Sequence, residues 1–225
     1  MVYGGAMVVA PETGEIEWAN MISRESIDHV LGQYARQGAS PLVYWMSGTE
    51  DKVSWLEGTE TGGIRSYLSS RRGDPRLLPV RSWSDVDRDR VFYVTVIGGR
   101  HEVEPLTRRL RSGPSLARSL HIVQQQDTYR PEETWLELTD ANATKATAGQ
   151  QLLERLGATR LISFGDNQND LPLARIADLS LATANATAEF RQAASEVIGS
   201  NDADGVARWL AKEVRRTTDA KARQG

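Results

Sequence analysis

The sequence predicts an α/β protein whose C-terminal part contains an open parallel sheet. From about residue 135 onward, helical and strand-like segments alternate in units long enough for parallel βαβ crossovers. Between about residues 20 and 134, strand-like segments and strand pairs dominate and are mixed with helices. The clearest of them, "RVFYVTVIG" at 90–98, is β-branched and aromatic throughout. The chain therefore contains two structural regimes.

The first segments predict a hairpin and a capped helix. "AMVVA" and "EIEWA" flank "PETG", whose Pro and Gly favour a turn. Ser23 is a suitable N-cap for a helix that ends at Gly38 and carries its apolar residues on one face. Residues 48–90 are less regular. The remaining elements expected in this part are strands at 41–45, 90–98, 119–126 and 134–140, and helices near 63–70 and 102–113.

The C-terminal part follows a stricter order. A helix over 143–157 ends at Gly157, and "RLISFGD" at 160–166 has the composition of a fully buried strand. Pro172 suits the first turn of the next helix. The expected elements after that strand are helices at 171–177, 187–194 and 204–216, and strands at 179–183 and 196–200.

Composition excludes several functional classes. A net charge of −3 provides no basic footprint for nucleic acid. The absence of cysteine excludes disulfides, thiolate metal sites and cysteine nucleophiles. No apolar run approaches the ~20 residues that span a bilayer, and the first residues lack the features of a signal peptide. We therefore expect a cytoplasmic protein with no nucleic-acid or membrane partner.

The segment "FGDNQNDLPL" at 164–173 has the features of a metal site. Loops at the carboxyl ends of parallel strands form ligand sites, and this loop directly follows the strand "LISF". Asp166 and Asp170 stand four residues apart where the loop turns into a helix, so both carboxylates can converge on one hard cation such as Mg²⁺. Calcium is disfavoured, because Leu171 stands where an EF-hand loop needs glycine. In the alternative interpretation Asp166 is a helix cap and its neighbours form a turn.

Residues 144–210 resemble the C-terminal half of the haloacid dehalogenase (HAD) superfamily, in its Cof-like phosphatase branch. The resemblance lies in a lysine at a helix start, a strand followed by "GDNQND", the later "ATANA", and "NDADGVARWL". It implies that Lys145 neutralises phosphate charge and that Asp166 and Asp170 hold Mg²⁺. It also implies that Asn169 accompanies these ligands and that Asn185 lies near the phosphate.

Residues 3–26, "YGGAMVVAPETGEIEWANMISRES", resemble the hairpin that leads into that family's inserted cap. The resemblance implies a Rossmann-like core made of residues 1–19 and 135–225, with an α/β cap domain over 20–134. In the family, a DxD nucleophile motif and a Ser/Thr motif precede this hairpin, so we expect an incomplete core without its N-terminal part. No substitute nucleophile is evident. Asp85, Asp87 and Asp89 precede a strand instead of following one, and the three histidines are isolated in cap elements.

Three functions remain open. The chain is a Mg²⁺-dependent phosphatase of small phosphorylated metabolites, such as sugar phosphates, if the missing nucleophile is supplied. Alternatively it is a non-hydrolytic ligand-binding or dimeric protein, or an enzyme with different chemistry in the pocket under the cap. Without the nucleophile carboxylate we expect weak Mg²⁺ binding. The unpaired edge of the strand "RLISF" should also favour a homodimer or a complementing chain.

The aromatic residues of the cap permit two interpretations. They could line a pocket for a sugar or an aromatic substrate, together with two arginines. Packing within the cap's sheet, with solvated arginines, is the favoured alternative. The residues concerned are Trp45, Trp55, Trp83, Tyr93, Arg65 and Arg71.

Overall fold

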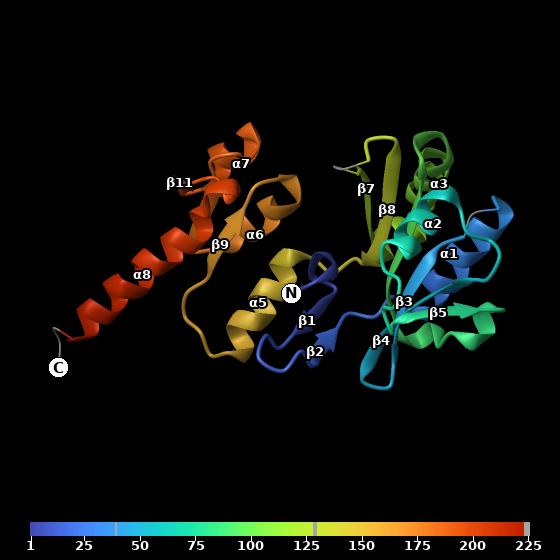
Figure 1. Ribbon diagram of the computed structural model, residues 1–225, viewed down its shortest axis with the longest axis horizontal. Helices are drawn as coiled ribbons and strands as arrows, with labels where there is room; N and C mark the ends of the chain where they lie inside the picture. The colour runs from blue at the N-terminus through green and yellow to red at the C-terminus, as the bar shows by residue number, and fades with distance from the viewer. Residues whose placement is uncertain (39, 128–129, 223–225) are drawn as a thin grey trace. The chain divides into compact units, whose positions relative to one another are not determined.

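The computed structural model describes residues 1–38, 40–127 and 130–222. The chain divides into two compact units, Met1–Thr144 and Lys145–Gly225, whose elements are labelled in Figure 1. None of the described helices is long and apolar enough to cross a membrane.

The first unit is built on a mixed six-stranded sheet. Its neighbouring strands are antiparallel except for β4 and β5, which are parallel. The strands, in their order across the sheet, are β5 (Leu77–Val80), β4 (Glu50–Leu56), β3 (Leu42–Ser47), β6 (Val91–Gly99), β8 (Glu133–Asp140) and β7 (Leu120–Gln126).

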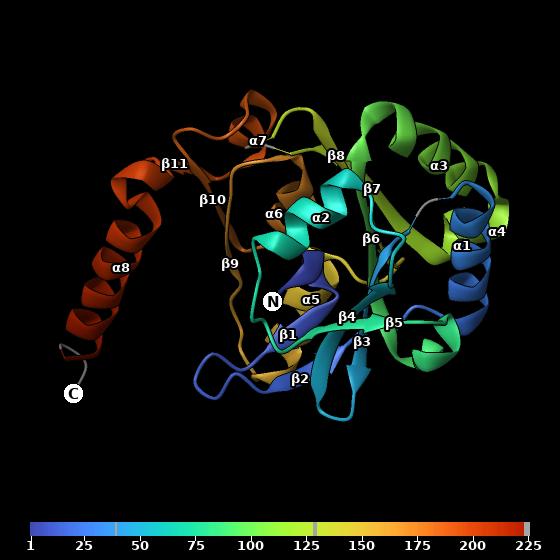
Figure 2. The same ribbon diagram turned by 45° about the vertical axis from the view of Figure 1, so that its right-hand side comes forward.

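Helices and a hairpin cover the two faces of this sheet, as Figure 2 shows. Helices α1 (Arg24–Arg36), α3 (Arg100–Ser112) and α4 (Pro114–Ser119) bury their apolar residues against one face. Helix α2 (Gly62–Ser69) and the hairpin of β1 (Met7–Val9) and β2 (Ile16–Ala19) pack against the other. Because side chains alternate along a strand, Val43 and Trp45 of β3 join the first cluster while Leu42, Tyr44 and Met46 join the second.

Several local predictions for this unit are confirmed. The Ser23 side chain accepts a hydrogen bond from the Ser26 amide at 3.3 Å and so caps α1. Gly38, just past the end of that helix, has φ +65°, a conformation that favours glycine. Strands β4 and β5 were not predicted. The first half of β4 is polar, and β5 carries Pro79, which is tolerated because β5 is an edge strand.

The expected boundary at 134/135 falls inside β8. This strand pairs with β6 on one side and with β7 on the other, so residues 133–140 belong to the six-stranded sheet. The hairpin of residues 7–19 also lies within the first compact unit. The boundary between the two compact units therefore lies after Thr144. The assignment of residues 1–19 and 135–225 to one ancestral core stays a prediction.

The second unit contains the predicted parallel sheet. Its strands β9 (Ile162–Gly165), β10 (Leu179–Thr183) and β11 (Glu196–Ile198) lie in the order β11-β10-β9 and pair in parallel. Helices α5 (Lys145–Arg155), α6 (Leu171–Ile176), α7 (Ala188–Ala193) and α8 (Gly205–Ala222) alternate with these strands along the chain. The last helix extends beyond the predicted 204–216.

The expectation of a fully buried strand at 160–166 was wrong. Of the four residues in β9, only Ser163 is buried. Within the described residues β9 pairs with β10 alone, so it lies at the sheet's edge and its apolar side chains are only half covered. The apolar composition was correctly observed, but the number of strands beside β9 cannot be derived from it.

Candidate functional site

The candidate site lies at the carboxyl end of β9. The strand ends at Gly165, and a short 3₁₀ turn over Gln168–Asp170 leads into α6. The Asn167 side chain caps this turn by accepting a hydrogen bond from the Gln168 amide at 2.8 Å. Pro172 stands in the first turn of α6, as predicted. These local preferences place Asp166 and Asp170 at the two ends of one tight loop.

Asp170 is the buried centre of this site. Its side chain is 10% exposed, and its Oδ1 forms an ion pair with the Lys145 Nζ at the start of α5. Its Oδ2 accepts a hydrogen bond from the Asp166 amide at 3.2 Å. The structure thus brings together Lys145, Asp166 and Asp170, three residues that the sequence singled out.

Asp166 is exposed, and its carboxylate has no hydrogen-bond or ion-pair partner among the described residues. The alternative role of Asp166 as a helix cap is wrong, because Asn167 occupies the N-cap position. Its carboxylate therefore remains available for a cation or a ligand.

The two predicted asparagines differ in their surroundings. Asn169 is exposed, and its side chain has no hydrogen-bond partner in the described part of the chain. Asn185 follows β10, and its Oδ1 accepts a hydrogen bond from the Asn201 amide at 3.2 Å. Asn185 therefore connects the loop after β10 to the loop after β11. Direct roles of either side chain in phosphate binding stay predictions.

Two further contacts brace the loop, and the sequence did not point to either. The Thr187 amide donates to the Asp166 carbonyl at 2.9 Å, and the Gln168 Nε2 donates to Glu189 Oε2 at 2.7 Å. Both connect the loop after β9 with the start of α7. The Thr187 side chain also caps α7 by accepting a hydrogen bond from the Phe190 amide. A threonine in front of this helix was the one sequence signal that could have indicated the position of Thr187.

The donor set fits Mg²⁺. The described residues contain no group of three or more His, Cys, Asp or Glu side chains that could hold a metal ion. Magnesium is commonly bound through only one or two carboxylates, with waters and substrate phosphates as its other ligands. Asp166 and Asp170 can supply those carboxylates, and Lys145 adds a positive charge beside them. An ion held by two carboxylates alone should bind weakly.

The other candidate residues have structural roles. Trp45, Trp55 and Tyr93 are buried in the first unit, and Trp83 is half-buried against its core, which favours the packing interpretation of these aromatic residues. Asp87 is the N-cap of one short 3₁₀ turn, and Asp85 accepts a hydrogen bond from the Ser82 amide in the capping box of another. Asp89 forms an ion pair with Arg24 at 2.7 Å. Acidic side chains engaged in turns and surface pairs are poor candidates for a nucleophile.

The chain is similar to known hydrolases and phosphatases. A family model described as haloacid dehalogenase-like hydrolase matches residues 1–210. Over 80 residues, 35% of this chain and 30% of the relative, the sequence is 38% identical to a "Putative phosphatase" of Haemophilus influenzae. Over 77 residues, 33% of this chain and 28% of the relative, it is 32% identical to the 5-amino-6-(5-phospho-D-ribitylamino)uracil phosphatase YitU of Bacillus subtilis.

Solved structures agree on the fold. A haloacid dehalogenase-like hydrolase from Bacteroides thetaiotaomicron superposes with a TM-score of 0.75 at 21% identity, covering 93% of this chain and 74% of that one. The matched residues span less than a third of the length of the two curated relatives. The sequence match to those proteins is therefore local, whereas the structural similarity extends over nearly the whole chain.

Proposed function

Because the chain belongs to the haloacid dehalogenase-like hydrolases, we propose that it serves the Mg²⁺-dependent hydrolysis of phosphate monoesters of small metabolites. The observation that carries the proposal is the Lys145–Asp170 ion pair beside the unpartnered Asp166 carboxylate, at the carboxyl end of a parallel strand. This is the edge of an α/β sheet at which ligands bind.

Each residue has a distinct role in this proposal. Asp166 and Asp170 hold the cation, which when bound neutralises phosphate charge and fixes the orientation of the phosphoryl group. Lys145 places its ammonium against the same phosphate and meanwhile keeps Asp170 oriented through their ion pair. Asn169 is free to donate to a phosphate oxygen. Asn185 keeps the neighbouring loop in place through Asn201.

The nucleophile is the missing component of this set. We find no residue in the sequence that matches an aspartate nucleophile following a strand and preceding the hairpin. Hydrolysis would therefore need a nucleophile that a partner chain or a residue not yet assigned supplies. Lys145, Asp166 and Asp170 can bind and orient a phosphate without it.

We propose the substrate class from the name of one curated relative. One curated relative is named for a phosphorylated ribitylamino-uracil. A small organic phosphate, sugar-like or with a ring attached, is therefore the first class to test.

The experiment is phosphate release with a metal control. The purified chain would be incubated with a panel of sugar phosphates and nucleotides, in Mg²⁺ or in EDTA, beside Asp166→Asn. Glu196→Gln is the matched control, because Glu196 is an exposed carboxylate of the same unit that lies on β11. Release that needs both Mg²⁺ and Asp166 supports the proposal and indicates that a second copy of the chain, or a residue not yet assigned, supplies the nucleophile. Equal release by Asp166→Asn, or no release in Mg²⁺, would contradict the proposal.

A second candidate function rests on the edge of the sheet. Strand β9 has one partner strand within the described chain, so its other edge offers unpaired backbone groups to a further strand. We propose that this edge pairs with a second copy of the chain or with a complementing chain. Sedimentation of the wild type beside Ile162→Pro would test this idea, because Leu161 and Ser163 face β10 while the Ile162 N–H points to the free edge, where proline removes a donor. A wild-type chain that sediments as a monomer would refute pairing with a second copy.

A further inference from the structure

The first unit contains a large open pocket that the proposed phosphatase chemistry does not use. Its volume is about 1130 Å³, larger than the pockets that typically hold small molecules. The hairpin β1–β2 forms one side, and the β3–β4 turn with the residues before β5 forms another. All of its lining residues belong to Met1–Thr144, so the pocket is complete within one compact unit.

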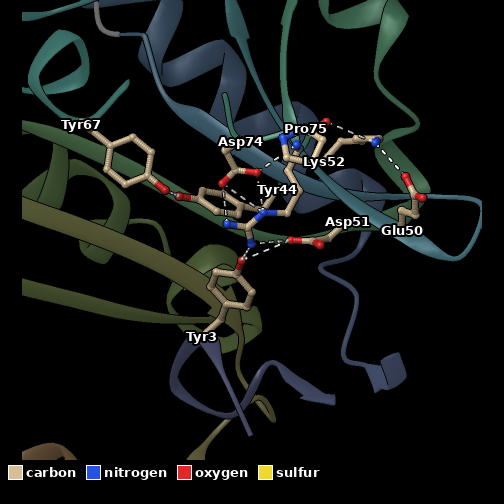
Figure 3. A network of polar contacts seen from close by, with 9 residues as sticks. Tyr3, Tyr44, Glu50, Asp51, Lys52, Tyr67, Asp74 and Pro75 are labelled. Atoms are coloured by element: carbon tan, nitrogen blue, oxygen red, sulfur yellow. Dashed lines mark hydrogen bonds and ion pairs between the residues drawn. The ribbon is translucent and has the colours of Figure 1, made fainter. Parts of the chain in front are cut away.

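One wall of the pocket carries a polar network that Figure 3 displays. The Arg76 Nη1 donates to the Tyr3 hydroxyl at 3.2 Å and to Asp51 Oδ2 at 3.3 Å. The Tyr3 hydroxyl also donates to Asp51 Oδ2 at 3.2 Å. On the other side of the guanidinium, Asp74 accepts from Nη2 at 2.7 Å. Fixed donors and acceptors thus alternate along this wall.

The network keeps its components in defined protonation states. The Arg76 guanidinium holds the pKa of Asp74 at about 2, chiefly through their hydrogen bonds. Burial raises the pKa of the Tyr3 phenol, so it remains neutral at physiological pH. The Tyr3 ring packs against Tyr44 and Phe92, each at a centroid distance of 5.3 Å. These contacts hold Tyr3 at φ +50°, an uncommon conformation for a tyrosine.

The rest of the lining is largely apolar and contains sulfur. It includes Trp18 and Ile16 of β2 and three methionines, Met7, Met21 and Met46. Methionine sulfur is polarisable and packs well against aromatic rings. Aromatic side chains add offset or edge-on ring contacts. A flat π-system therefore fits this lining better than a ligand with hydroxyl groups on all sides, since those hydroxyls would lose hydrogen bonds to water.

The charges around the pocket balance. Its lining carries the acids Glu15, Glu50 and Asp51 and the bases Lys52, Arg76 and Arg90. Lys52 is paired with Glu50 at 2.8 Å. The Arg90 Nη2 donates to the Gly48 carbonyl at 2.7 Å, and no ion pair of this guanidinium occurs among the described residues. A mostly neutral ligand is thus favoured, with Arg90 able to accept one anionic substituent.

We propose that this pocket binds a heteroaromatic ring of nucleobase-like chemistry. The ring lies against apolar side chains of the lining, while its edge exchanges hydrogen bonds with Asp51, Arg76 and Tyr3. An anionic substituent on the ligand pairs with Arg90. Binding at this pocket depends neither on the phosphatase activity nor on its metal.

Direct binding tests the proposal in EDTA, so that any hydrolysis is suppressed. The wild-type chain would be titrated by calorimetry with adenosine, uridine and adenosine 5′-monophosphate, and in separate arms with ribose 5-phosphate and inorganic phosphate. We expect the nucleosides to bind with dissociation constants below about 1 mM. The monophosphate should bind more tightly, and neither the sugar phosphate nor phosphate should compete with adenosine.

A variant that fills the pocket localises the binding. Thr49→Phe adds bulk at an exposed lining position of the β3–β4 turn and should weaken adenosine binding at least tenfold. Ser69→Phe is the control, because Ser69 is exposed on α2 and does not line the pocket. Arg90→Gln should remove the advantage of the monophosphate while leaving adenosine binding unchanged.

Three outcomes would overturn the proposal. They are the absence of nucleoside binding, nucleoside binding that Thr49→Phe leaves intact, and equally tight binding of ribose 5-phosphate that Thr49→Phe abolishes. The last result would identify a sugar site instead. Circular dichroism of each variant establishes that the chain is folded before its binding is compared.

Discussion

Gly165 lies against Phe190 so closely that a side chain on the glycine has no space. A Cβ placed there would lie 2.5 Å from the Phe190 Cζ and 2.6 Å from the Asp170 Cβ. Phe190 is fully buried in the core of the second unit. The strand that ends at the candidate site is therefore held against α7 and the loop at 166–170 by a contact that only glycine permits.

Gly165→Ala should destabilise the protein by about 1–3 kcal/mol, the usual cost of overpacking a dense core. Urea denaturation measures the change. Phe190→Leu in the same chain should recover part of the loss by removing the atoms that clash. Gly32→Ala is the control, since Gly32 lies within α1 with nothing within 4 Å of its Cβ position. That variant should be neutral or more stable by up to about 1 kcal/mol.

The Lys145–Asp170 pair should be strongly coupled, because both side chains are largely covered, with exposures of 29% and 10%. A double-mutant cycle with Lys145→Met and Asp170→Asn should give a coupling energy of about 1–3 kcal/mol. The exposed pair Arg100–Glu104 is the comparison and should couple by less than about 0.5 kcal/mol. Equal coupling in the two pairs would mean that Asp170 does not depend on Lys145.

Asp166→Asn should leave the free energy of unfolding within about 0.5 kcal/mol of the wild type, because the side chain is exposed and unpaired in the described structure. It should nevertheless abolish the rise in melting temperature that millimolar Mg²⁺ produces in the wild type. Thermal denaturation across a Mg²⁺ series measures both effects, and Glu196→Gln should respond as the wild type does. A wild-type melting temperature that does not change with Mg²⁺ would argue against a cation site at Asp166 and Asp170.

Asp74 should contribute a stability that depends on pH. Its pKa falls from 3.8 to about 2 in the folded chain, chiefly because Arg76 donates hydrogen bonds to it. A lowered pKa stabilises the folded state at pH values above the unfolded pKa of 3.8. This contribution is lost as the pH falls from about 4 to 2. Asp74→Asn should cost about 1–2 kcal/mol at pH 7 and almost nothing near pH 2. A difference in unfolding free energy between the wild type and Asp74→Asn that stays the same at both pH values would contradict the lowered pKa of Asp74.

Glu137 should have the opposite dependence. Burial raises its pKa above 4.5, although the hydrogen bond from Tyr93 offsets part of that effect. A raised pKa of an acid means that the folded state favours the protonated form, so stability falls as the pH rises above about 4.5. Glu137→Gln should therefore gain stability relative to the wild type between pH 4 and pH 7, measured by urea denaturation at both values.

The sequence alone determined most of the local structure. Caps such as Ser23, turn glycines such as Gly38 and the β-branched run of β6 act within a few residues of themselves, so their effects could be predicted without the fold. The same holds for the loop at 166–170, where the strand, the glycine and the two aspartates follow one another directly. The alternation of helix and strand also sufficed to predict the parallel sheet.

Only the tertiary structure decided which distant residues meet. The distance from Lys145 to Asp170 depends on how α5 packs near the end of β9, and the contact of Tyr3 with Asp51 and Arg76 depends on how a hairpin packs on a six-stranded sheet. Strand register and helix packing set these positions, and no periodicity within a short segment encodes them. For the same reason the half-exposed state of β9 and the pocket beside Arg76 were not evident from the amino-acid order.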